Sequence, residues 1–191
     1  AASRTIPERW SRQMNYRPIT DVWILARPKV KYYGAYPNGF LERARALVGA
    51  AIDEPVLHVC GGRVREYPIR GGFGVNDKTL DLDPELEPDY LQDANKPFPV
   101  YQWAGVLIDR PYTDDDADHY APGRDVLPTA NKLVRNALEV LPTGRKVGIL
   151  DYLFPSPPPK SSKIDSKLIA TIGVLMGYNN RMRCFTVFER R

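Results

Sequence analysis

Apolar and polar positions follow one another along this chain in runs that predict helices and strands in turn. Apolar residues three and four positions apart predict a helix over roughly 39–51, with Asn38 as its N-cap, and a second helix over about 133–141. Short apolar runs bounded by glycine, proline or acidic residues predict strands before, between and after these helices. The predicted strands cover residues 55–59, 78–82, 104–108, 146–152, 168–177 and 182–190.

The order of these elements predicts an α/β fold. Strand, helix, strand, helix and a closing hairpin are typical of an open, mostly parallel sheet with one antiparallel edge. The hairpin turn is expected at YNNR, between the last two strands. The Pro- and Ser-rich segment 154–163 is expected to form an extended surface loop.

Length and composition narrow the class of protein. With 191 residues, 43% hydrophobic and 26% charged, the chain is expected to form one soluble domain with a substantial core. It has no apolar run of about 18–20 residues, and AASRTIPERWSRQ lacks the apolar core of a secretory signal. Two cysteines, Cys60 and Cys184, are too few for a structural zinc site, so no metal is expected. We therefore expect a cytoplasmic protein with free thiols, although a single Cys60–Cys184 bridge stays open.

The net charge of +4 conceals an acidic middle between two basic flanks. Residues 1–50 carry nine basic and three acidic side chains, 51–130 carry seven and sixteen, and 131–191 carry eleven and four. This division suits a cationic ligand held centrally and an anionic partner, such as DNA or RNA, held by the ends. Ordinary solvated surface charge explains it equally well.

Ligands of open parallel sheets bind outside the carboxyl ends of the strands, so site residues are expected at those ends. In VLHVCGG (56–62), two glycines follow a buried strand and let the backbone approach a ligand closely. Asp81 ends the next strand 19 residues after Gly62, which is the position of an acid that binds a ribose diol. A tight turn without ligand and a solvated acidic loop are the respective alternatives.

Two further strand ends carry candidate chemistry. In DYLQDANKPFP, Asp93 is placed to meet the amino group of a bound base, although this pattern is also common at surfaces. In VLIDRPYT (106–113), Asp109 can accept a hydrogen bond from an amine, Pro111 fixes the turn, and Tyr112 offers a ring for stacking. That set suits a planar amino group. A plain strand-ending turn is the alternative.

In order and spacing, these four strand ends resemble the class I S-adenosylmethionine-dependent methyltransferases. The resemblance implies a Rossmann-like sheet with a C-terminal antiparallel hairpin strand over residues 35–191, preceded by a basic and aromatic extension over 1–34. The segment 32–48 is similar to the one that covers the methionine part of the cofactor in amino methyltransferases. The cofactor contacts implied by this resemblance are Tyr33, His58, Cys60, Gly61, Gly62, Asp81, Leu82, Asp93 and Ala94.

IDRPYT resembles the DPPY motif of enzymes that methylate exocyclic amino groups, chiefly DNA adenine methyltransferases. The resemblance implies catalytic roles for Asp109, Arg110, Pro111 and Tyr112, and a nucleobase of DNA or RNA as the acceptor. The chain departs from the family pattern at four positions. His58 replaces an acid, Cys60 and Val64 replace the first and third glycines of the loop, and Arg110 replaces the first proline of DPPY.

Two other classes stay open. A Rossmann oxidoreductase with a nicotinamide dinucleotide shares the glycines and Asp81, but the chain lacks G-x-G-x-x-G, and IDRPYT is then unexplained. A non-catalytic binding module with the methyltransferase fold is favoured by His58 and Arg110. The sequence makes no prediction of oligomeric state.

Overall fold

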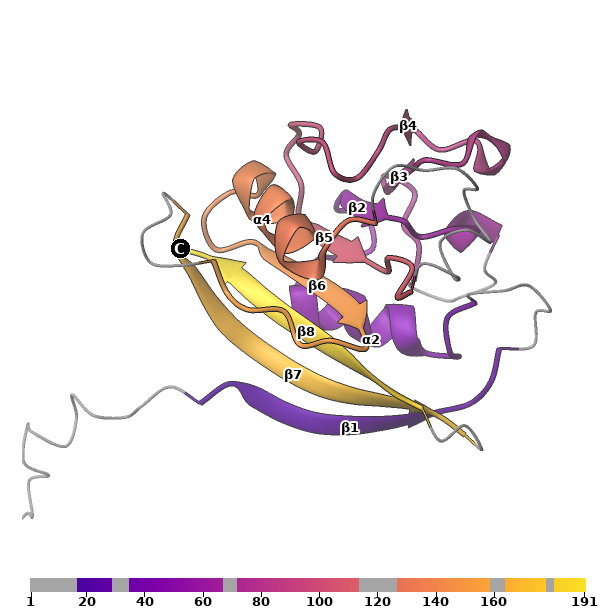
Figure 1. Ribbon diagram of the computed structural model, residues 1–191, viewed down its shortest axis with the longest axis vertical. Coiled ribbons are helices and arrows are strands. Elements are labelled where there is room, and N and C mark those ends of the chain that lie inside the picture. The colour runs from indigo at the N-terminus through magenta and orange to yellow at the C-terminus, as the bar shows by residue number, and fades with distance from the viewer. Residues whose placement is uncertain (1–16, 29–34, 67–71, 114–126, 159–163, 178–180) are drawn as a thin grey trace, which may run out of the picture.

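The computed structural model describes residues 17–28, 35–66, 72–113, 127–158, 164–177 and 181–191. Eight strands within these residues form a single sheet in the order β1-β7-β8-β6-β5-β2-β3-β4 (Figure 1). The strands are β1 (Ile19–Leu25), β2 (Val56–Val59), β3 (Lys78–Asp81), β4 (Tyr90–Leu91), β5 (Gly105–Ile108), β6 (Lys146–Asp151), β7 (Ser166–Met176) and β8 (Met182–Arg190). The helices are α2 (Phe40–Val48), α4 (Ala130–Val140) and the short 3-10 turns η1 (Val64–Glu66) and η2 (Pro84–Leu86).

The sheet confirms the predicted fold class. Strand β8 runs antiparallel to both β6 and β7, and the other neighbouring strands in the described part of the chain are parallel. One detail differs from the prediction, because the hairpin is not the edge of the sheet. Strand β8 inserts between β6 and β7, and β1 extends the sheet beyond β7.

Strand β1 lies within residues 1–34, which the sequence assigned to an extension outside the domain. All seven residues of β1 pair in register with β7, so β1 is part of the single sheet, and the division at residue 34 stays a prediction. Trp23 and Leu25 face the core and are buried, whereas Val22 and Ile24 on the other face are exposed. Five of its seven residues are apolar, but Ile19 and Asp21, which share the face of Trp23 and Leu25, are exposed, so the apolar pattern does not mark one buried face.

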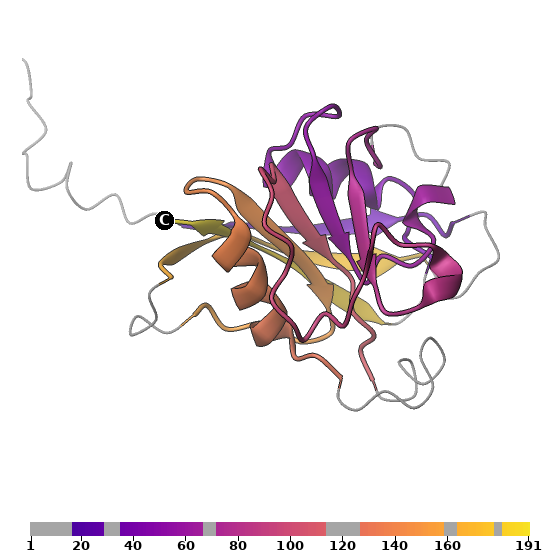
Figure 2. The same ribbon diagram turned by 90° about the horizontal axis from the view of Figure 1, so that it is seen from above.

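The two α-helices cover opposite faces of the sheet (Figure 2). Helix α2 buries its apolar side in a cluster that also contains Phe185 of β8. Helix α4 buries Leu133 and Leu138 in a second cluster, together with Trp103 before β5. Each fully buried leucine contributes about 1.5–3 kcal/mol relative to an exposed one, so the two clusters fix both helices to the sheet.

The predicted N-cap of the first helix, Asn38, is wrong. Helix α2 begins after Gly39 (φ 76°), which has no side-chain cap, whereas the predicted cap Asn38 donates its amide to the carbonyl of Arg27 at 3.1 Å. Helix α4 begins after Thr129, whose hydroxyl accepts a hydrogen bond from the backbone N–H of Lys132 at 3.3 Å.

Within the described ranges, no helix is both long and apolar enough to cross a membrane. The same residues contain no group of three or more His, Cys, Asp or Glu side chains arranged to hold a metal ion. Cys60 and Cys184 are both free thiols and partly buried.

Candidate functional site

The candidate site lies where the strand order of the sheet reverses. From β2 the chain continues to β3 on one side, whereas β5 lies on the other side of β2 and leads on to β6. Such a reversal opens a crevice at the carboxyl ends of the two central strands. The loop Cys60–Gly62 leaves β2 there, and Asp109 follows β5, with its N–H bonded to the Val59 carbonyl at 3.1 Å.

The loop after β2 has a backbone shape that exposes one glycine. Cys60 and Gly62 both have φ of +53°, the left-handed region that glycine adopts without strain. A Cβ built at Gly62 meets no atom within 4 Å, whereas one at Gly61 lies 3.3 Å from Val64. Gly61 therefore packs against the protein, and Gly62 presents backbone to open space where a ligand can approach.

Asp81, at the end of β3, lies beside the same glycine loop. Its Oδ1 accepts hydrogen bonds from the backbone N–H of Leu82 at 2.8 Å and of Asp83 at 3.3 Å. Burial raises the pKa of Asp81, and backbone hydrogen bonds from Asp83, Leu82 and Gly62 oppose the shift. Because the Leu82 side chain is exposed, its predicted part in the site is limited to the backbone.

The segment after β4 carries Asp93 at the carboxyl end of that strand. Oδ1 of Asp93 accepts a hydrogen bond from the N–H of Asn95 at 2.8 Å. Ala94 is buried, and its carbonyl accepts from the Asn136 amide of α4 at 3.1 Å. These bonds fix the turn, so the predicted pair Asp93–Ala94 has a defined orientation.

The predicted acids converge around Cys60. Burial raises the pKa of the Cys60 thiol well above its usual value, and the nearby carboxylates of Asp81, Asp109 and Asp93 raise it further. These residues come from the ends of four different strands. The structure therefore brings together the acids that the sequence placed at separate strand ends.

Asp109 lies in a cluster of phenol groups. The Tyr112 hydroxyl donates to Oδ1 of Asp109 at 2.6 Å, and Arg183 Nη1 donates to that hydroxyl at 3.2 Å. Burial raises the pKa of Asp109 to about 6, against the opposing effects of the Arg183 charge and of hydrogen bonds from Tyr112 and Tyr36. The carboxyl group therefore changes charge close to neutral pH.

An aromatic pair lies beside this carboxyl. The rings of Tyr112 and Tyr152 have centroids 4.5 Å apart and are tilted by 55°. Tyr152 follows β6 directly, and its side chain is partly exposed. The pair provides aromatic surface at the carboxyl ends of β5 and β6.

The Arg110 side chain is paired with Asp151 at the end of β6. Its Nε donates to Asp151 Oδ2 at 2.7 Å, its Nη1 donates to the Pro111 carbonyl at 2.9 Å, and the side chain is 5% exposed. The guanidinium thus joins the turn after β5 to the end of β6. The predicted role of Arg110 at the acceptor is therefore assigned to its backbone carbonyl.

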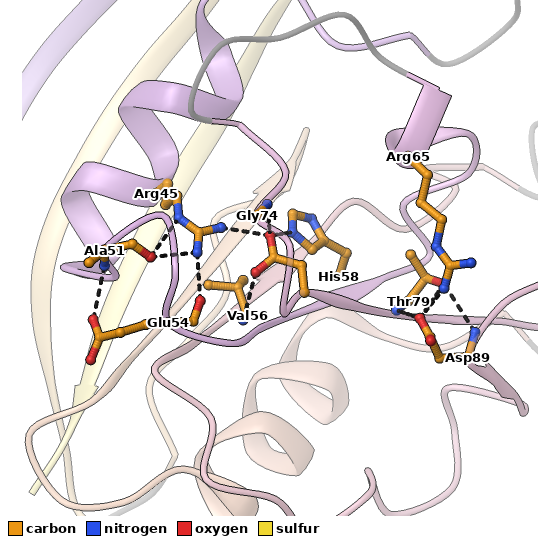
Figure 3. Close-up of polar contacts among 10 residues, drawn as sticks. Arg45, Ala51, Glu54, Val56, His58, Arg65, Gly74, Thr79 and Asp89 are labelled. Atoms are coloured by element: carbon orange, nitrogen blue, oxygen red, sulfur yellow. Dashed lines mark hydrogen bonds and ion pairs between the residues drawn. The ribbon is translucent and has the colours of Figure 1, made fainter.

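The His58 imidazole is fully buried, and it takes part in a network of polar contacts that includes Arg45 and Gly74 (Figure 3). Its Nε2 lies 3.0 Å from Oδ2 of Asp77, and its Nδ1 has no hydrogen-bond partner among the described residues. The ring also packs against Phe73 at a centroid distance of 5.0 Å. Contact between His58 and a cofactor stays a prediction.

Asp77 is the centre of this buried network. Its carboxylate accepts from Arg45 Nη1 at 2.6 Å, from Gly74 N–H at 2.7 Å and from Val56 N–H at 2.9 Å, in addition to His58 (Figure 3). Burial favours the neutral acid, but hydrogen bonds from His58 and Arg45 outweigh it and lower the pKa of Asp77. The network joins α2 to the amino-terminal ends of β2 and β3.

Some site residues were not predicted. Asp151 ends β6 in the same way that Asp109 follows β5, so the acid-after-strand pattern was a usable signal. Arg183 gave no local signal, because it reaches the site from a strand distant in sequence. Tyr36 lies in the segment 32–48 and Tyr152 ends the predicted strand 146–152, but neither was singled out as a site residue. The predicted contact Tyr33 lies outside the described residues.

Two solved structures share this fold over most of the chain. TrmN from Thermus thermophilus aligns with a TM-score of 0.57 at 18% identity, over 83% of this chain and 50% of TrmN. SMU.1697c from Streptococcus mutans, described as a methyltransferase and solved in complex with SAH, aligns with a TM-score of 0.51 at 9% identity, over 78% of this chain and 97% of its own. The present chain thus spans about half the length of TrmN.

Neither a protein-family model nor a curated protein matches the sequence. The structural likeness therefore establishes the fold. The chain has a Rossmann-like methyltransferase fold, with the candidate residues at the carboxyl ends of its central strands.

Proposed function

We propose that this protein is an S-adenosylmethionine-dependent methyltransferase that acts on an exocyclic amino group of a nucleobase in DNA or RNA, with adenine as the first base to test. The observation that carries the proposal is the position of Asp109. Its carboxyl lies across the strand reversal from the glycine loop, held by the Tyr112 hydroxyl at 2.6 Å.

The residues around the crevice fit the proposed cofactor. Gly62 faces open space, and Asp81 offers a carboxylate for a ribose diol. The turn of Asp93 and Ala94 is held by hydrogen bonds with Asn95 and Asn136, and we assign it to the adenine ring. When bound, the cofactor supplies an electrophilic methyl group on a sulfonium cation, and the acids around the loop suit that positive charge. The SAH in SMU.1697c supports this choice.

The acceptor half of the site fits a planar amine. In this proposal, ionised Asp109 accepts a hydrogen bond from the amino N–H, and the Arg110 carbonyl accepts a second. Together they orient the nitrogen lone pair, which forms the new N–C bond as the C–S bond breaks. Positioning of this kind supplies most of the rate enhancement, because little acid–base chemistry is required. A base in a duplex is first flipped out, at a cost of a few kcal/mol.

Calorimetric titration with S-adenosylmethionine, S-adenosylhomocysteine and NAD tests the cofactor. We expect micromolar binding of the first two and none of NAD. Transfer of labelled methyl groups to DNA and RNA oligonucleotides, with and without adenine, then tests the acceptor. Asp109→Ala is expected to abolish transfer while sparing cofactor binding, and full activity of this variant would exclude the assigned role of Asp109.

A binding module is the second candidate function. It is favoured because the His58 and Arg110 side chains, two departures from the family pattern, are both committed to buried carboxylates. Cofactor binding without transfer to any nucleic acid supports this reading. Binding of NAD alone supports a nicotinamide-dependent oxidoreductase instead.

A further inference from the structure

Arg183 reaches the candidate acceptor site from the last strand of the sheet. Because β8 is antiparallel to β6, the start of β8 lies beside the end of β6, with Cys184 opposite Asp151. Side chains alternate along a strand, so Arg183 shares the face of Phe185, which packs against Phe40 of α2. The antiparallel strand thus delivers a cation to the end of the sheet where the parallel strands deliver acids.

The guanidinium acts on Asp109 through one intermediate group. Arg183 Nη1 donates to the Tyr112 hydroxyl oxygen at 3.2 Å, and the hydroxyl donates its proton to Asp109 Oδ1 at 2.6 Å. A hydroxyl has a single proton, so accepting from Arg183 directs that proton toward the carboxylate. Burial, followed by the charge of Asp109, raises the pKa of Tyr112, so the phenol stays protonated as a donor.

Several other groups face the same carboxyl. Tyr36, which precedes α2, donates a second phenol hydrogen bond to Asp109. Asp151 at the end of β6 and Cys60 after β2 add acidic groups. Of the groups that act on Asp109 in this cluster, Arg183 carries the positive charge, whereas the Arg110 guanidinium is paired with Asp151.

We propose that Arg183 is a positioning residue for methyl transfer, which acts through the Tyr112 hydroxyl to keep Asp109 ionised and in one orientation. This inference rests on the proposed function. A neutral Asp109 carboxyl presents a donor where the amine requires an acceptor. Without Arg183, the Tyr112 hydroxyl loses the partner that fixes its direction.

The inference can be tested without cofactor or substrate. The carboxyl carbon of Asp109 is followed by NMR in ¹³C-aspartate-labelled protein from pH 4 to 9, with Asp109→Asn to assign the signal. We expect a wild-type midpoint near the pKa of about 6. In Arg183→Met, the midpoint is expected to rise by about one pH unit, since an opposite charge within a few ångströms lowers a carboxyl pKa by roughly 1–3 units.

The control is Arg181→Met, which removes the same charge just before β8 begins at Met182. A midpoint close to wild type in this control supports the specific role of Arg183. An equal shift in both variants, or none in Arg183→Met, overturns the inference.

Two further variants decide the matter if Arg183→Met does not fold. Tyr112→Phe removes the intermediate hydroxyl and is expected to raise the midpoint, whereas Arg183→Lys keeps the charge and is expected to lie between wild type and Tyr112→Phe. A wild-type midpoint in Tyr112→Phe overturns the inference.

Methyl transfer gives a separate readout. In Arg183→Met, the acidic limb of the rate profile is expected to move to higher pH, with a larger loss in kcat than in affinity for the cofactor. A protein that shows the NMR shift but binds no S-adenosylmethionine contradicts the proposed function alone. An active enzyme in which the titration midpoint of Asp109 is the same in wild type and in Arg183→Met contradicts this inference alone.

Discussion

The Nε of Arg110 lies 2.7 Å from Oδ2 of Asp151, and both side chains are almost completely buried. The same guanidinium donates to the Pro111 carbonyl, so it joins the turn after β5 to the end of β6. A proline in place of Arg110 would fix the turn through its ring. Here an ion pair with the neighbouring strand fixes the turn.

Arg110→Leu is expected to lower the free energy of unfolding by about 3–5 kcal/mol, because it leaves Asp151 buried without its cation. Urea denaturation monitored by circular dichroism measures this loss. The double variant Arg110→Leu/Asp151→Leu removes both charges and is expected to recover a large part of the stability. A double variant less stable than Arg110→Leu would contradict this account of the ion pair.

Asp77→Ala is expected to lower the free energy of unfolding by roughly 3 kcal/mol or more, the penalty for breaking a buried ion pair. It removes the carboxylate that neutralises Arg45 and the partner of His58 Nε2. The comparison is Asp89→Ala, whose partners Arg65 and Lys78 are 39% and 46% exposed. Exposed pairs contribute about 0–1 kcal/mol, so this variant is expected to be much more stable than Asp77→Ala. Urea denaturation at pH 7 distinguishes the two.

The pH dependence provides a second check on Asp77. Its pKa is lowered in the folded protein, so its ionisation stabilises the fold at neutral pH. That contribution is lost as the pH falls from the usual carboxyl range through the lowered folded pKa. The gap between wild type and Asp77→Ala is therefore expected to narrow in acid. A constant gap from pH 7 to pH 3 would contradict the assignment.

The sequence predicted the central strands and the acids at their ends because both depend on local patterns. A short apolar run followed by glycine or aspartate marks a buried strand that reaches the functional edge of the sheet. Asp81, Asp93 and Asp109 accordingly lie near one another around Cys60. The predicted helix at residues 39–51 also exists, although it begins after Gly39.

The sequence could not predict contacts that depend on tertiary structure. The partner of His58 is Asp77, which precedes β3, and no local pattern links the two residues. Arg183 reaches Tyr112 only because β8 inserts between β6 and β7. The edge position of β1 was also hidden, since its outer face is exposed and its inner face contributes two buried residues.

Gly62 and Gly144 offer a matched pair of substitutions for testing the ligand loop. Their φ values are +53° and +84°, and a Cβ at either position meets no atom within 4 Å. Alanine is therefore expected to cost about 1–2 kcal/mol of stability at each position, through backbone strain alone. Only Gly62→Ala is expected to weaken S-adenosylhomocysteine binding, because its methyl group enters the space over the loop. We expect the affinity to fall by tenfold or more, and tenfold corresponds to about 1.4 kcal/mol of binding free energy.

Calorimetric titration of both variants at one pH measures these affinities. Equal affinities in Gly62→Ala and Gly144→Ala would place the cofactor elsewhere. Weaker binding in both variants would indicate a global effect of backbone strain.

Asp109→Asn is expected to change how stability depends on pH. Burial raises the pKa of Asp109 from 3.8 to about 6, so between these values the folded protein retains a proton that the unfolded chain has lost. The free energy of unfolding therefore falls as the pH rises from about 4 to 6, and this loss persists above pH 6. Asparagine has no such proton, so relative to wild type the variant should become more stable by up to about 3 kcal/mol between pH 4 and pH 7. Urea denaturation at both pH values measures the change. If the difference between wild type and variant were the same at both pH values, Asp109 would be ionised as readily in the folded protein as in the unfolded chain. The acidic limb expected in the rate profile of methyl transfer would then no longer follow from the burial of Asp109.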